Sequence, residues 1–396
     1  AAAIGAASLL IATNAIAQNV PFSTHDWTLS IAGPEPFLIF NEAWADVKMP
    51  GGFPVTAAAF PPGIPATVDS RFTYAVGTIE VNQTIAGLFS TQPVTTGGGA
   101  FPFALPGNQA RQVAMLQFNN GVNFNVTPRY FYGTTNTDPL RATNARGVSV
   151  WRTGNAATDR IAICGETYDE TLPESQALAG WGFSNAVSSS GFIAVFDGDG
   201  ILQWTHHFFD PANPGTASCA ITDISIRVDG EGNDIVTYCG ISTHGAPAGG
   251  ELAPLNEYPA VGACNGGATP LPAGQWDGIV GRVVFPFPGT AVSGRLFHAN
   301  VGGPGQDGLF GLAEIDENRF AVAGSSQAPA GQGGFPFSSQ CGLLGPYVVG
   351  AVLVFDSTGG VLAAPDSEPL GTNGLGINTV ARDVHIGRNG WGAGLN

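Results

Sequence analysis

The sequence predicts an all-β protein built from repeated antiparallel sheets, and three observations support this. A pattern of apolar strand, turn and second strand ending in glycine recurs roughly every 80 residues, which indicates one supersecondary unit used several times. Apolar residues at helical spacing are nearly absent beyond the first residues of the chain. Several expected strands are apolar without interruption, as in Phe192–Phe196, so both faces of their sheets must be covered.

One unit shows the pattern most clearly. Its first strand alternates apolar and polar residues, as expected of a half-exposed strand. The turn at 229–233 is rich in Gly and Asn, which tolerate positive φ, and this favours a hairpin over a calcium-binding loop. A long loop rich in Gly, Ala and Pro separates the second strand from the third. The expected strands are Ile221–Val228, Asp234–Gly240, Gly278–Phe285 and Val292–Val301.

A glycine that closes the second strand identifies the other copies. It ends the segments Ile85–Gly87, Ile163–Gly165, Tyr238–Gly240 and Val322–Gly324. In the weaker first copy, Thr73–Ile79 is the expected first strand and Gln83–Gly87 the second. A fifth copy begins at Val380–Asn389. The expected units are 71–143, 144–217, 218–303, 304–375 and a partial one at 376–396, after an N-terminal segment or partial blade at 18–70.

A β-propeller accounts for the repeat. The inner strands of four-stranded antiparallel blades are covered on both faces by the neighbouring blades, as uninterrupted apolar strands require. A pair of β-sandwiches would explain neither the fixed period nor the shared glycine. About four to five blades are visible in the sequence, so we expect an incomplete ring.

Several motifs resemble those of a known family. The first half of a repeat is represented by residues 226–229 (IRVD), Gly232-Asn233 and Tyr238–Gly240, and a third-strand ending by 196–200 (FDGDG). These residues resemble secreted bacterial propellers built of SBBP-type (seven-bladed β-propeller) repeats. The resemblance covers Arg71–Asn396 and implies the propeller fold and export. The loops between second and third strands are far longer than in the compact family pattern.

Composition limits the partners and the compartment. A net charge of −16 and a pI near 4.5 argue against nucleic acid or an anionic membrane surface as partner. Residues 1–17 are small, apolar and uncharged and end in an Ala-x-Ala pattern before Gln18, which predicts a signal peptide; a short buried helix is the alternative. No other segment is long and apolar enough to span a bilayer. We therefore expect a secreted or cell-surface protein.

The five cysteines fit an oxidising compartment but define no disulfide framework. Cys164 and Cys239 occupy the same position in successive units, which indicates small core residues. From the sequence alone, a disulfide between Cys219 and Cys264 and one between Cys239 and Cys264 are both possible.

The long second-to-third-strand loops should emerge on one face, which is the expected recognition surface. The densest carboxylate cluster and the aromatic residue that follows it are the ligand-face candidates: Glu166, Tyr168, Asp169, Glu170, Glu174 and Trp181. Calcium could bind such oxygens, although a solvated acidic loop is the commoner arrangement. His206 and His207 are adjacent on a strand and point to opposite faces, so they do not form a shared metal site.

Catalytic motifs are not evident. The chain contains no Gly-x-Ser-x-Gly elbow, and its glycine-rich runs do not lie between a strand and a helix. The sequence therefore favours an exported, non-catalytic β-propeller that binds a protein, a glycan or a surface polymer through loops on one face. An extracellular propeller hydrolase or lyase and a structural surface or adhesin segment are the alternatives.

Overall fold

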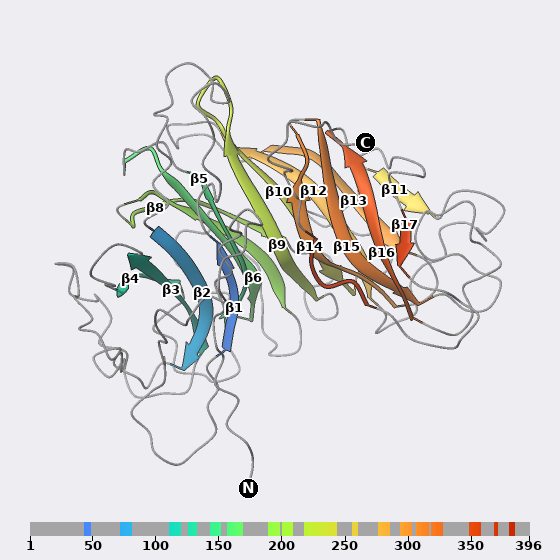
Figure 1. The fold of residues 1–396 in the computed structure, drawn as a ribbon, viewed down its shortest axis with the longest axis horizontal. Coiled ribbons are helices and arrows are strands. Elements are labelled where there is room, and N and C mark those ends of the chain that lie inside the picture. Colours follow the sequence, from blue (N-terminus) through green and yellow to red (C-terminus); the bar gives the residue numbers. More distant parts are fainter. Residues whose placement is uncertain are drawn as a thin grey trace, which may run out of the picture.

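The computed structural model describes the strands and the shorter turns of the chain. The described residues are 43–48, 72–80, 111–119, 126–132, 143–151, 157–168, 189–198, 200–208, 218–243, 256–259, 276–285, 294–302, 306–316, 318–327, 348–357, 368–370 and 380–384. Every regular element in these ranges is a β-strand (Figure 1). The all-β prediction is confirmed for them.

The strands form four sheets in chain order. Within each sheet, strands that follow one another along the chain are antiparallel neighbours, except at β11. Sheet A contains β1 (Ala43–Lys48), β2 (Phe72–Glu80), β3 (Arg111–Asn119) and β4 (Val126–Tyr132). Sheet B contains β5 (Thr143–Trp151), β6 (Arg160–Thr167), β7 (Ser190–Phe196) and β8 (Leu202–Phe208). Sheet C contains β9 (Cys219–Val228), β10 (Asp234–Ser242), β12 (Asp277–Phe285) and β13 (Gly294–Gly302), with β11 (Asn256–Pro259) parallel to β13. Sheet D contains β14 (Asp307–Glu314), β15 (Arg319–Gln327), β16 (Val348–Asp356) and β17 (Glu368–Leu370).

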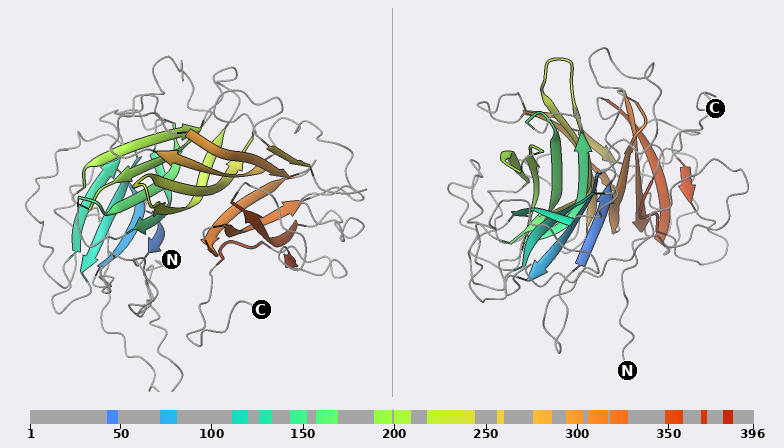
Figure 2. Two further views of the ribbon diagram at one scale, coloured as in Figure 1. Left: turned by 90° about the horizontal axis from the view of Figure 1, so that it is seen from above. Right: turned by 60° about the vertical axis from the view of Figure 1, so that its left-hand side comes forward.

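The sheets pack face to face in the order A, B, C, D. The first strand of each following sheet makes most of the contact: β5 lies against sheet A, β9 against sheet B and β14 against sheet C. Seen from above, the sheets follow an arc with sheets A and D at its two ends (Figure 2). The described sheets do not close into a ring.

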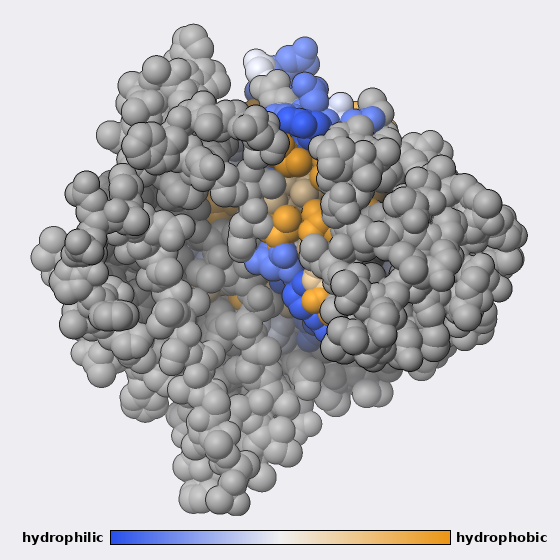
Figure 3. All heavy atoms as spheres, turned by 45° about the vertical axis from the view of Figure 1, so that its right-hand side comes forward, coloured by the Kyte–Doolittle hydropathy of each residue, from blue (hydrophilic) through white to orange (hydrophobic). Residues whose placement is uncertain are grey.

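The hydrophobic core lies between the sheets. One cluster of buried apolar residues fills each of the three contacts between neighbouring sheets. Every residue of β7 is buried, as its uninterrupted apolar sequence predicts for a strand covered on both faces. The described residues that reach the surface in Figure 3 are apolar in the middle and hydrophilic towards both ends.

The structure corrects the predicted strands of the first unit. Residues 72–80 form β2, the second strand of sheet A, because they pair with both β1 and β3. The first strand is β1, which lies in the segment 18–70. The predicted second strand at Gln83–Gly87 falls outside the described residues, and Gly77 takes the position expected for Gly87. The prediction was wrong because β1 is short and its sequence has no clear repeat signature.

The repeated glycine has a structural cause. In each sheet the first strand carries a β-bulge, an extra residue, beside the partner of this glycine. A Cβ at Gly165 would lie 1.9 Å from the Asn144 carbonyl oxygen, and a Cβ at Gly240 would lie 2.2 Å from that of Ala220. Only glycine leaves room for the bulged strand at these two positions.

The residues after the bulges of β5 and β9 form a contact between these two first strands. A Cβ at Gly147 in β5 would lie 3.2 Å from the Cα of Asp223 in β9. The Asp223 carboxylate accepts backbone N–H groups from Ile224 at 2.8 Å and from Leu312 in β14 at 2.7 Å. Asp223 therefore links sheet C both to the sheet before it and to the sheet after it.

Residues 380–384 repeat this contact on sheet D. A Cβ at Gly311 would lie 2.6 Å from the Cα of Asp383, and the Asp383 carboxylate accepts the Val384 N–H at 2.8 Å. The Arg382 guanidinium lies 4.5 Å from the centre of the Phe310 ring. This segment, where a fifth copy was predicted to begin, thus occupies the place that β9 takes against sheet B.

Some predictions concern residues outside the described ranges. The signal peptide at 1–17 and most of the long loops are among them. In the parts of the chain that the structure describes, we find no helix with the length and hydropathy of a membrane span. The unit boundaries remain predictions.

Candidate functional site

The roots of the long second-to-third-strand connections lie at one end of the sheets. In sheet B the connection leaves at Thr167 and returns at Ser190, which are paired in register. In sheet C it leaves at Ser242 and returns at Asp277, again a register pair. The strand order is the same in sheets A and D, where the connections leave after β2 and β15. We call this end of the molecule the loop end.

Hydrogen bonds at the loop end join one sheet to the next. Between sheets B and C, the Cys219 N–H donates to the Ser189 carbonyl at 2.9 Å, and the Ser189 N–H donates to the Ser218 hydroxyl at 3.2 Å. Within sheet C, the Thr243 N–H donates to the Ser218 carbonyl at 2.8 Å, which ties the start of the 243–276 connection to the same point. These bonds hold the roots of two long loops beside each other.

Equivalent bonds occur at the other two contacts. The Ala145 N–H donates to the Thr78 hydroxyl at 3.0 Å, between sheets A and B. The Asp307 N–H donates to the Trp276 carbonyl at 2.7 Å, between sheets C and D. The loop end is therefore a continuous, hydrogen-bonded platform across all four sheets.

Glu166 lies in β6 at the loop end. Its Oε1 accepts hydrogen bonds from the Arg146 guanidinium at 2.8 Å and from the Asn144 amide at 3.2 Å. The residue is buried, whereas Arg146, the bulge residue of β5, is half exposed. The carboxylate is thus an internal ion-pair partner and does not belong to a solvated acidic loop.

Tyr168 follows β6 and is partly buried. Burial and the Glu166 carboxylate raise the pKa of its phenol, against the opposing effects of a hydrogen bond with Ser189 and of Arg146. The phenol therefore stays protonated at neutral pH. The structure brings Glu166 and Tyr168 together; the other four candidates, Asp169, Glu170, Glu174 and Trp181, lie outside the described residues.

Within the described ranges, no three His, Cys, Asp or Glu side chains form a group suited to a metal ion.

Cys164, Cys219 and Cys239 are buried thiols that form no disulfide. Neither of the two bridges to Cys264 left open by the sequence is therefore formed. Burial raises the pKa of the Cys219 thiol far above its ordinary value, so it is not a nucleophile at neutral pH. Cys164 and Cys239 fill the core, as their repeated position predicted.

These thiols should be inert in the folded protein. We expect no reaction of Cys164, Cys219 or Cys239 with an aromatic disulfide reagent at pH 8, and rapid reaction of all three in denaturant. Mass spectrometry of the labelled peptides would measure this. Labelling of Cys219 in the native protein would contradict its burial.

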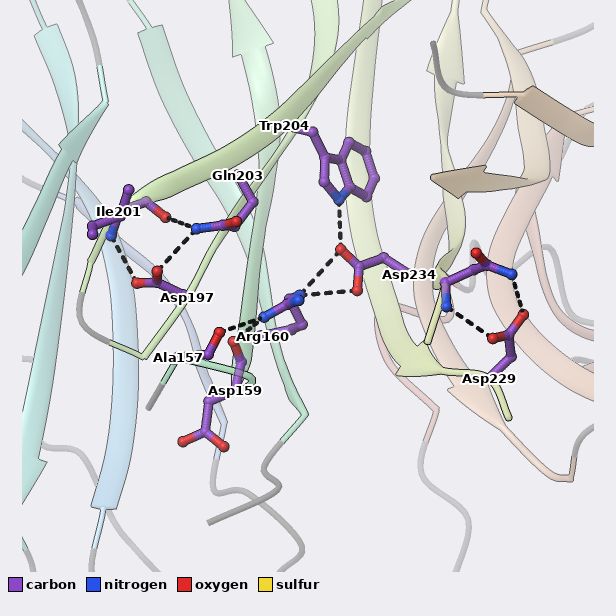
Figure 4. A network of polar contacts seen from close by, with 10 residues as sticks. Ala157, Asp159, Arg160, Asp197, Ile201, Gln203, Trp204, Asp229 and Asp234 are labelled. Atoms are coloured by element: carbon purple, nitrogen blue, oxygen red, sulfur yellow. Dashed lines mark hydrogen bonds and ion pairs between the residues drawn. The ribbon is translucent and has the colours of Figure 1, made fainter. Parts of the chain in front are cut away.

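A second polar network lies at the opposite end of sheets B and C. The Arg160 Nε lies 3.0 and 3.2 Å from the two carboxylate oxygens of Asp234 in β10, and the Trp204 indole N–H donates to the same carboxylate at 2.8 Å (Figure 4). Arg160 and Asp234 are almost completely buried. Burial raises the pKa of Asp234, opposed by the hydrogen bond from Trp204 and by Arg160.

This network was not predicted from the sequence. Arg160 and Asp234 begin the second strands of neighbouring units, a position where charged residues usually face solvent. The signal that could have revealed the pair is the equal placement of opposite charges in two successive copies. Figure 4 also shows the turn at 229–233, where the Asp229 carboxylate accepts hydrogen bonds from the Asn233 backbone and side chain. The predicted hairpin turn is confirmed.

Sheets C and D have their own buried polar contact. The Thr237 hydroxyl donates to Glu314 at 2.6 Å, and the Arg282 Nη2 lies 3.4 Å from the same oxygen. The Arg282 guanidinium also lies 5.4 Å from the centre of the Phe320 ring. Burial lowers the pKa of Arg282, opposed by Glu314. These polar groups lie between sheets C and D and help to hold the two sheets together.

No protein-family model matches the chain, and no curated protein sequence matches it.

Proposed function

We propose that this chain is an exported, non-catalytic β-propeller of the SBBP-repeat type that binds a protein, a glycan or a surface polymer through the loop end. The observation that carries the proposal is that the roots of long connections from successive sheets are joined by hydrogen bonds into one platform. Long loops on a rigid scaffold are the usual carriers of recognition.

The chemistry near the platform favours binding over catalysis. Glu166 is neutralised by an ion pair with Arg146, and the Cys219 thiol is held in its protonated form. Tyr168 and the serine and threonine hydroxyls of the platform are hydrogen-bonding groups without an activating base among the described residues. Such groups suit a partner that offers many weak polar contacts.

Loop replacement tests this proposal. Residues 169–188 would be exchanged for a short Gly-Asn hairpin, which can join the antiparallel strands β6 and β7. We expect the thermal unfolding temperature to change little, while binding to the glycan, polysaccharide or extracellular protein retained by the unmodified chain on an array falls at least tenfold.

The matched control shortens the connection 286–293 between β12 and β13, which lies at the opposite end of the molecule. It should leave binding unchanged. Equal loss in both variants would contradict recognition by the loop end. Turnover of any polysaccharide or peptide on the array would show that the chain is a hydrolase or lyase instead.

A further inference from the structure

Two arginines and one carboxylate meet between sheets C and D, at the end opposite the loop end. Ile226 of β9 belongs to the core between sheets B and C, so the next residue, Arg227, faces sheet D. Arg282 of β12 also faces sheet D, because its guanidinium contacts Glu314 of β14. We call Arg227, Arg282 and Glu314 the arginine cluster.

Glu314 satisfies the arginines of the cluster only in part. Its Oε1 accepts the Thr237 hydroxyl at 2.6 Å. The Arg282 Nη2 lies 3.4 Å from the same oxygen, which is longer than the roughly 2.7–2.9 Å of a charge-assisted hydrogen bond. The Arg282 Nε donates to the Thr237 hydroxyl at 2.9 Å. Two positive charges thus share one carboxylate, whose closest contact is with a neutral hydroxyl.

Two buried polar atoms of the cluster have no hydrogen-bond partner among the described residues. One is the Arg227 Nε, which is a donor, and the other is the Glu314 Oε2, which is an acceptor. Leaving a buried donor or acceptor unpaired is costly. A bound species that satisfies both atoms would therefore be favoured.

The charges of the cluster favour an anion. Burial lowers the pKa of Arg282, Glu314 opposes this effect, and the nearby Arg227 charge lowers the pKa further. Arg282 is 2% exposed, so water does little to screen the repulsion between the two guanidinium groups. Two further carboxylates at this end, those of Asp229 and Asp316, are held within their own turns. Among the described side chains, the cluster therefore lacks one negative charge.

We propose that the arginine cluster binds one hydrogen phosphate ion between Arg227 and Glu314, beside Arg282. The Nε and one Nη of a guanidinium form a fork that matches two phosphate oxygens. Phosphate in neutral water also keeps a hydroxyl, which can donate to the Glu314 Oε2. A single ion thus supplies the missing acceptor, the missing donor and the missing negative charge.

This position can be reached from solvent. The Glu314 side chain is 20% exposed, and Arg227 is partly exposed near the end of β9. An ion bound there would join β9 to β14. Phosphate should therefore stabilise the packing of sheet C on sheet D.

Sulfate distinguishes this site from a general anion site. Sulfate resembles phosphate in size and charge but has no hydroxyl, so it would place an acceptor against the Glu314 carboxylate. A site rejects an analogue strongly when that analogue leaves a buried polar group unpaired. We expect sulfate to bind at least about tenfold more weakly than phosphate.

Isothermal titration calorimetry of the full chain at pH 7 tests the proposal, with the ionic strength held constant by sodium chloride. We expect one phosphate per chain, and a midpoint of thermal unfolding that rises with phosphate concentration. Arg227→Met should weaken phosphate binding at least about tenfold, because it removes the guanidinium fork. Arg319→Met is the matched control: Arg319 lies at the same end in an exposed pair with Asp316, and its loss should not change phosphate binding.

Glu314→Gln tests the origin of the selectivity. The glutamine keeps an oxygen for the Thr237 hydroxyl and places an amide donor at the second position. This variant should bind sulfate and phosphate with little difference between them. If it does not fold, Arg227→Met and the comparison of the two anions on the unmodified chain still decide the question.

Three results would overturn the proposal: no saturable phosphate binding, equal affinity of the unmodified chain for phosphate and sulfate, or unchanged phosphate binding in Arg227→Met. The arginine cluster lies opposite the loop end, so the proposal does not depend on the proposed recognition function. Replacement of residues 169–188 should leave phosphate binding intact, and Arg227→Met should leave partner binding by the loop end intact.

Discussion

Arg160→Ala should lower the free energy of unfolding by about 3–5 kcal/mol, because it leaves the Asp234 carboxylate buried without its cation. Arg160 is 2% exposed and Asp234 0% exposed, so water cannot replace the lost partner without disrupting the contact between sheets B and C. The Trp204 indole N–H alone would remain to solvate the carboxylate. Urea unfolding followed by circular dichroism would measure the change.

Arg319→Ala is the matched control. Arg319 also begins the second strand of its sheet, but it pairs with Asp316 at the surface, where both side chains are 41% exposed. Exposed pairs contribute about 1 kcal/mol or less, so the loss should be small. Arg160→Met combined with Asp234→Leu removes both charges and should recover most of the stability. An Arg160→Ala cost no larger than that of Arg319→Ala would refute a stabilising role for the buried pair.

Gly165→Ala should destabilise the protein by about 3 kcal/mol or more, and Gly240→Ala by a similar amount. The added Cβ would lie 1.9 Å from the Asn144 carbonyl oxygen in the first variant and 2.2 Å from the Ala220 carbonyl oxygen in the second. These oxygens belong to backbone at a β-bulge, so they cannot move aside as a flexible side chain would. Thermal and urea unfolding would both report the loss.

Gly230→Ala is the control for this pair. Gly230 lies in the exposed turn between β9 and β10, and a Cβ there would meet no atom within 4 Å. We expect a change within about 0.5 kcal/mol, as for most surface substitutions. Similar stability of the Gly165→Ala and Gly230→Ala proteins would mean that the bulge can rearrange. The structure would then not require glycine at position 165.

Much of the strand pattern could be predicted from the sequence because it depends on local periodicity. The second strands at 160–165, 234–240 and 319–324 agree with β6, β10 and β15. The burial of β7 followed from its apolar run. In the first unit the predicted strand order was wrong by one strand, because a long connection separates β1 from β2. Pairing between strands so far apart in the chain leaves no turn motif in the sequence between them.

The candidate site was less predictable. Glu166 was recognised as part of an acidic cluster, but its partner Arg146 lies at the bulge of another strand, and only the register of β5 and β6 brings them together. The pair of Arg160 and Asp234 depends on the packing of two sheets. Such contacts depend on how one sheet packs on the face of the next. The spacing of residues within a single strand does not predict that packing.

The sequence by itself determined that the chain is all-β, and it marked the second strands β6, β10 and β15 with a glycine. It could do so because strand alternation, turn residues and repetition are properties of neighbouring residues. Only the tertiary structure decided why that glycine is needed: the bulged first strand places a carbonyl oxygen where its Cβ would be. It also decided which charges are buried, because contacts such as that of Arg160 with Asp234 arise only when one sheet packs on the next.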